Sequence, residues 1–119
     1  MIVRAGILYD GTLEPPKCNV DIVINDGRIE EIRTASGTCE HEAACVTPGL
    51  VNAHVHLEMS GEPDAMSLVQ TTTPNQRLLR AVENARKSIK AGVTTIRDVG
   101  SSNCIAPDVH DAIEEGRIP

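Results

Sequence analysis

The chain has 119 residues and a formal net charge of −6, and it contains no cluster of basic residues. This charge argues against nucleic acid and against an anionic membrane surface as partners. The apolar fraction of 40% supports a core, but Tyr9 is the single aromatic residue, so the core must be aliphatic. The sequence shows neither a signal peptide nor a run of membrane-spanning length, which predicts a cytoplasmic protein.

The first 47 residues indicate a small β unit. Short strands are predicted over residues 1–5, 6–9, 19–24, 29–32 and 44–47. The pair Asp26-Gly27 lies between two β-prone runs and is a strong local signal for a hairpin. We therefore expect a β-meander that buries too little apolar area to be stable alone.

A Pro-Gly break at Pro48-Gly49 precedes the segment on which the functional interpretation depends, since it carries two histidines. If residues 51–58 form a strand, alternation of side chains places His54, His56 and Glu58 on one face. Two imidazoles side by side can chelate one divalent metal ion. The same alternation also fits an edge strand with one solvated face, so the histidines alone leave both interpretations open.

A helix is predicted after a long loop over residues 59–73. Thr73, Pro74 and Gln76 carry the signature of a capping box with proline at the first helical position. Gly92 is a suitable end for this helix. Its expected apolar stripe consists of Leu78, Leu79, Val82, Ala85 and Ile89.

Residues 93–99 read as a second strand, and residues 107–115 as a second helix. A strand, a helix and a strand over this length predict a βαβ unit, in which the two strands are parallel. Because parallel sheets are covered on both faces, His54 and His56 would then lie in an interior.

The four cysteines, at positions 18, 39, 45 and 104, show no CxxC spacing and no secretory context, so we expect reduced thiols. Cys39, His41 and Cys45 offer two thiolates and an imidazole, which leaves a small structural zinc site as an alternative. Such sites normally have four ligands and more closely spaced cysteines. The favoured interpretation is a solvated loop that runs into a buried Cys45.

The segment from Pro48 to Leu57 resembles the start of the first barrel strand in the amidohydrolase superfamily, where a Pro-Gly turn leads into a strand ending in HxH. Residues 91–100 resemble the second barrel strand of its imidazolonepropionase-like and prolidase-like branch, and the preceding β unit resembles the sandwich that flanks the barrel. The resemblance implies an α/β fold: a small N-terminal β-sandwich portion over residues 1–47, then the first βαβα part of a TIM-type (β/α)8 barrel over residues 48–119, truncated.

By this resemblance the protein is a metal-dependent hydrolase that cleaves amide, cyclic amide or dipeptide C–N bonds with a metal-activated water. His54 and His56 would be metal ligands, and zinc is the expected divalent ion, with iron, manganese and cobalt left open. Asp98 would orient a ligand histidine, unless it only caps a neighbouring loop. The expected partner is a small amide or dipeptide-like substrate. The number of metal ions and assembly into a homo-oligomer stay open.

Members of the superfamily draw further ligands from later strands: a carbamylated lysine or a glutamate, two histidines, and an aspartate that acts as general acid and base. These positions would lie beyond Pro119. The chain is therefore expected to be the amino-terminal fragment of a longer hydrolase and to be inactive alone. The alternatives are a non-catalytic truncated or structural homologue, and a small protein with a zinc site at Cys39, His41 and Cys45.

Overall fold

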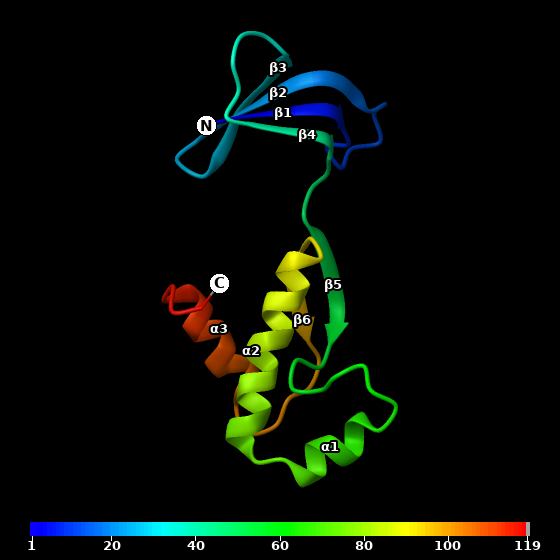
Figure 1. The fold of residues 1–119 in the computed structure, drawn as a ribbon, viewed down its shortest axis with the longest axis vertical. Helices are drawn as coiled ribbons and strands as arrows, with labels where there is room; N and C mark the ends of the chain where they lie inside the picture. Colours follow the sequence, from blue (N-terminus) through cyan, green and yellow to red (C-terminus); the bar gives the residue numbers. More distant parts are fainter. Residues whose placement is uncertain (119) are drawn as a thin grey trace. The chain divides into compact units, whose positions relative to one another are not determined.

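The computed structural model describes residues 1–118 and shows a mixed α/β chain (Figure 1). The chain divides into two compact units, one over Met1–Pro48 and a second that begins at Gly49. Among the helices of residues 1–118, none combines the length and the apolarity that crossing a membrane requires.

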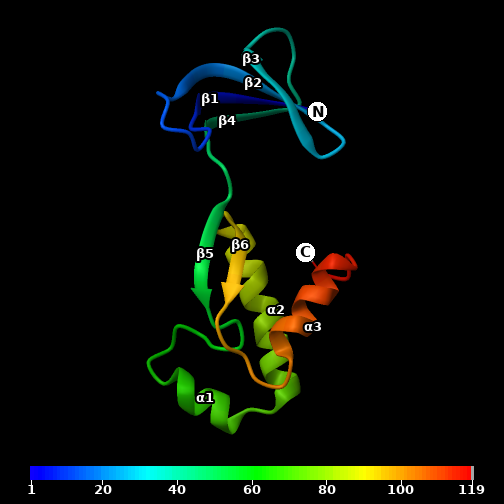
Figure 2. The same ribbon diagram turned by 180° about the vertical axis from the view of Figure 1, so that it is seen from behind.

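The first unit is a four-stranded sheet in the order β3-β2-β1-β4. β1 (Ile2–Leu8) pairs antiparallel with β2 (Lys17–Asn25), and β2 pairs antiparallel with β3 (Arg28–Thr34). β4 (His41–Val46) pairs parallel with β1, so the predicted meander is wrong at its last strand (Figure 2). The described residues of this unit form one sheet and supply no second layer of a sandwich.

The two strands predicted over residues 1–5 and 6–9 are one strand, β1, which runs through Gly6 and ends at Leu8. The missing side chain of Gly6 lets β4 pass close to β1. A Cβ at Gly6 would lie 2.8 Å from the carbonyl oxygen of Ala44. The pairing with β1 also starts β4 at His41, where a loop was predicted.

The predicted hairpin is confirmed. Asp26 and Gly27 have φ angles of 48° and 73°, and positive φ at both central residues is the mark of the tight turn that suits twisted strands. β2 and β3 therefore pair across it, with a bulge between Val23 and Ile24. The core of this unit consists of Ala5, Leu8, Val20 and Ile22.

The second unit contains the predicted βαβ arrangement. β5 (Leu50–Val55) pairs parallel with β6 (Val93–Asp98), and α2 (Pro74–Lys90) connects them, followed by α3 (Ile105–Glu114). The capping box of Thr73 and Gln76 is present. The largest differences from expectation are that β5 ends three residues before Glu58, that the predicted loop contains the helix α1 (Ala65–Thr71), and that α3 starts two residues early.

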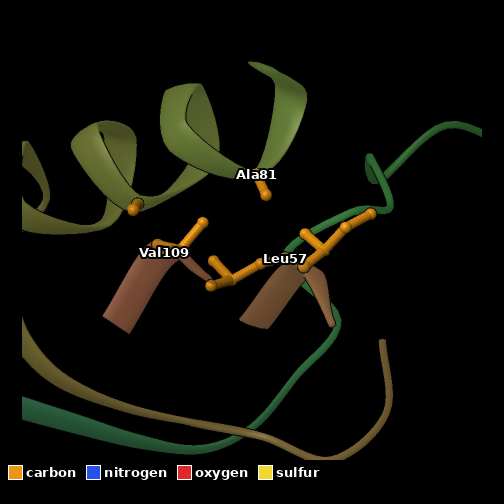
Figure 3. Packing of buried hydrophobic residues seen from close by; sticks show 5 residues of the cluster. Leu57, Ala81 and Val109 are labelled. Carbon is orange, nitrogen blue, oxygen red and sulfur yellow. The ribbon is translucent and has the colours of Figure 1, made fainter. Parts of the chain in front are cut away.

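α2 and α3 bury one apolar cluster against the β5–β6 pair, and Figure 3 shows part of it. The buried members are Leu57, Ala81, Ala85, Ile105 and Val109. The predicted stripe on α2 is partly wrong, because Leu79 is 71% exposed and Ile89 is 49% exposed. The buried face instead runs along every fourth residue through Arg77, Ala81 and Ala85.

Candidate metal centre

The two histidines lie at the carboxyl end of β5. His54 is near the end of the strand, and His56 follows its last residue, Val55. The register between β5 and β6 shifts between Asn52 and Val55, so the segment that carries His54 is irregular. Irregularities of this kind change the direction in which side chains point, and they are frequent beside active sites.

The two imidazole rings lie close together, with their centroids 5.5 Å apart and their planes at 76°. A zinc ion lies about 2.1 Å from an imidazole nitrogen, so two rings bound at a tetrahedral angle have centroids roughly 5 Å apart. The pair therefore fits a shared divalent ion. His54 is exposed and His56 is partly exposed, contrary to the predicted interior, because the sheet of the described unit has only two strands.

His56 is oriented by the backbone of the turn after β6. Its Nδ1 lies 2.7 Å from the carbonyl oxygen of Gly100. A carbonyl can only accept, so Nδ1 carries the proton in this hydrogen bond, and the lone pair of the neutral ring is on Nε2. This is the arrangement in which metal-binding histidines are usually held. The sequence reading missed Gly100, since a backbone acceptor leaves no signal in a side chain.

Asp98 lies at the end of β6 and links the turn after β5 to the turn after β6. Its carboxylate accepts hydrogen bonds from the backbone N–H of Leu57 and from that of Gly100, each at 2.9 Å. The contacts thus favour the loop-capping alternative over direct orientation of a histidine. Because Leu57 follows His56 and Gly100 supplies its acceptor, Asp98 still fixes the surroundings of that ring.

Glu58 does not share the histidine face, contrary to the prediction from strand alternation. Its side chain is 3% exposed and forms an ion pair with Arg77 at 3.2 Å. The backbone N–H of Ser102 donates to the same carboxylate at 2.9 Å. Strand geometry ends at Val55, so the alternation of faces no longer applies at position 58.

Cys39, His41 and Cys45 do not come together. His41 and Cys45 are four residues apart on the extended strand β4, which separates them by about 13 Å. Ligands of one zinc ion lie within roughly 4 Å of each other. Cys45 is exposed rather than buried. Within residues 1–118, no group of three or more histidines, cysteines or carboxylates is placed to hold one metal ion.

Comparison with known proteins points to one family. A family model described as "Amidohydrolase family" matches residues 45–118. A structure of a Xaa-Pro dipeptidase with bound methionine in its active site is similar over 99% of this chain and 30% of that chain, with a TM-score of 0.87 and 26% identity. An amidohydrolase structure is similar over 98% of this chain and 29% of that chain, with a TM-score of 0.72 and 27% identity.

The ochratoxinase of A. niger shares the fold, with a TM-score of 0.77 and 24% identity over 98% of this chain and 28% of that chain. Among curated proteins, none matches the chain. The chain thus spans 30% or less of the length of each of these three solved structures.

Proposed function

Because the chain belongs to the amidohydrolase family, we propose that its 119 residues contribute two metal ligands to a metal-dependent hydrolase of C–N bonds. The substrate class is a small amide, cyclic amide or dipeptide-like molecule. Support for this class comes from the similarity to a Xaa-Pro dipeptidase, and support for the reaction type comes from the family.

The observation that carries the proposal is the pair of imidazoles at the carboxyl end of β5. We assign β5, α2, β6 and α3 to the first two β/α repeats of a TIM-type barrel, preceded by a separate β unit over residues 1–47. In such barrels the active site lies at the carboxyl ends of the strands. His54, His56 and the Gly100 acceptor all belong to that edge.

The proposal gives each residue a separate role. His54 and His56 would hold the ion, for which zinc is the best match to imidazole donors. The chemistry that a bound divalent ion supplies is polarisation of the scissile carbonyl and activation of a water nucleophile. The Gly100 carbonyl keeps His56 in the tautomer that leaves Nε2 free, and Asp98 fixes the two turns around it.

The remaining chemistry needs groups from outside these residues. Two imidazoles hold a metal ion weakly, since catalytic zinc sites have three protein ligands. No third donor joins them among residues 1–118. We therefore expect the 119-residue chain to bind zinc but to hydrolyse no dipeptide by itself.

Zinc titration of the chain by isothermal calorimetry tests the proposal. We expect one weak site, and both His54→Ala and His56→Ala should weaken it by about tenfold or more. His110→Ala is the matched control, because His110 lies on α3 and forms no three-donor group with the two histidines among residues 1–118, and it should change the affinity less than twofold. A site that survives the double histidine variant and disappears in Cys39→Ala/Cys45→Ala would contradict the proposal.

A further inference from the structure

We propose that Glu58, Arg77 and Ser102 form a positioning device for His56. In this view their contacts hold the turn after β5 against the turn after β6, so that the Gly100 carbonyl stays on Nδ1 of His56. The inference rests on the proposed function, because it gives these residues a part in metal binding although they are not metal ligands. We call the three residues the turn clamp.

The turn clamp is densely connected, and two of its three residues are buried. Arg77 is 8% exposed and Glu58 is 3% exposed. The Glu58 carboxylate accepts from Nη1 of Arg77 at 3.2 Å, from the backbone N–H of Ser102 at 2.9 Å, and from the hydroxyl of Ser102. Nη2 of Arg77 donates to Oδ1 of Asn103 at 3.0 Å, so the guanidinium also holds the following residue of the β6 turn.

The positions of these residues tie the clamp to His56. Glu58 is two residues after His56, and Ser102 is two residues after Gly100. On the β6 turn, Gly100 therefore lies between two cross-links to the β5 turn, one from Asp98 to Leu57 and the other from Ser102 to Glu58. Loss of the clamp frees the far side of the β6 turn, so Gly100 can shift and Nδ1 of His56 loses its fixed acceptor.

Helix α2 supplies additional contacts to the turn after β5. Asn84 donates to the carbonyl oxygens of Leu57 and Met59 at 2.8 and 2.7 Å, and Arg80 donates to that of Glu58 at 3.3 Å. The β5 turn is thus attached to α2 through its backbone. The contacts of the Glu58 carboxylate with Ser102 differ from these, because they join the β5 turn to the β6 turn.

The clamp puts a charged side chain where stability would not require one. Arg77 occupies the buried face of α2 with Ala81 and Ala85, where an apolar side chain would be expected. Buried ion pairs can often be replaced by apolar residues of similar volume without loss of stability. A positioning role and a merely structural role therefore predict different results for such a replacement.

The decisive variant is Glu58→Leu/Arg77→Met, which replaces the ion pair by apolar groups of similar size. In the 119-residue chain, ¹⁵N NMR of the imidazole nitrogens at about pH 8, where a free imidazole is neutral, reports the tautomer of His56. We expect mainly Nδ1–H in the wild type and a mixture of both tautomers in the variant. Calorimetric zinc affinity should fall about tenfold in parallel.

Two further variants complete the design. Ser102→Ala keeps the ion pair and removes one hydroxyl, so it should shift the tautomer ratio in the same direction even if the double variant does not fold. Asp21→Asn is the matched control, because the buried Asp21 forms an ion pair with Arg4 in the other unit, so its replacement should leave His56 unchanged.

The outcomes separate the two claims. The positioning role would be overturned if the Glu58→Leu/Arg77→Met chain folds and His56 keeps the tautomer of the wild type. If that chain does not fold, the same result for Ser102→Ala would overturn it. If the wild type binds zinc through His54 and His56 in that case, the metal site stands without the clamp. If the wild type binds no zinc, the proposed metal site fails, and the tautomer measurement alone decides whether the clamp orients His56.

Discussion

The hydrogen bond from His56 to the Gly100 carbonyl is the contact on which the proposed ligand role of His56 depends most. An imidazole without a fixed acceptor exchanges between two tautomers, and only one of them presents Nε2. Here the acceptor is 2.7 Å away and belongs to the next strand's turn. His56 and the residue that orients it therefore come from two different turns, one after β5 and one after β6.

Asp21 provides a residue-scale prediction in the first unit. The Arg4 guanidinium and the backbone N–H of Ser36 hold the pKa of its carboxyl below the usual range. The unfolded chain therefore takes up this proton first, at a pH near 4, so the stabilisation is present at neutral pH and is lost as the pH falls through the lower folded-state pKa.

Thermal unfolding followed by circular dichroism between pH 7 and pH 2 checks the direction of this pH dependence. The midpoint temperature of unfolding of the wild type should decrease when the pH is lowered beyond about 4. Asp21→Asn should start from a lower midpoint at pH 7 and lose less of it on acidification. The exposed Glu30→Gln serves as control and should follow the wild type. An equal acid loss in wild type and Asp21→Asn would contradict the assignment.

Single residues differ in how far the sequence predicts their role. His54 and His56 could be identified because their spacing puts two donors near one strand end. Arg77 could not, since arginine is rarely buried and the helix pattern favours its solvent face. Gly100 could not either, because the acceptor is a carbonyl whose position depends on the register of β5 on β6.

At the scale of whole elements, α3 depends on its first turn. Ile105 is 2% exposed and packs with Leu57 and Val109, whereas Ile113 near the other end is 38% exposed. We expect Ile105→Ala to lower the free energy of unfolding by about 2–5 kcal/mol, because it leaves a cavity in the core.

Urea unfolding measures this difference, and Ile113→Ala on the same helix is the control, with an expected loss of about 1 kcal/mol or less. Equal losses for the two variants would show that α3 does not pack through its amino-terminal turn in solution.

Elements with local signals were predicted correctly. The Asp26-Gly27 hairpin and the capping box of Thr73 both involve residues close in sequence, and both are confirmed. Helix α1 was missed because it has no side-chain cap and no buried residue, so the sequence shows neither a capping signal nor an apolar stripe there. The parallel pairing of β4 with β1 was missed because it depends on a contact between residues about 38 positions apart.

At the scale of the whole molecule, the second unit contains only two strands of the barrel that we propose. The two-stranded sheet of the second unit leaves Leu50 and Val51 exposed at 58% and 68%. In the proposed barrel, neighbouring strands would cover these open edges and apolar faces. The three solved structures compared above are each more than three times as long as the chain.

The central claim is that His54 and His56 share one divalent ion, and zinc K-edge X-ray absorption of the chain loaded with one equivalent of zinc tests it most directly. We predict a nitrogen and oxygen shell at about 2.0–2.1 Å, with outer scattering from two imidazoles. The His54→Ala/His56→Ala variant should lose that scattering. A sulfur shell at about 2.3 Å in the wild type would contradict the account, because it would assign the metal to cysteines.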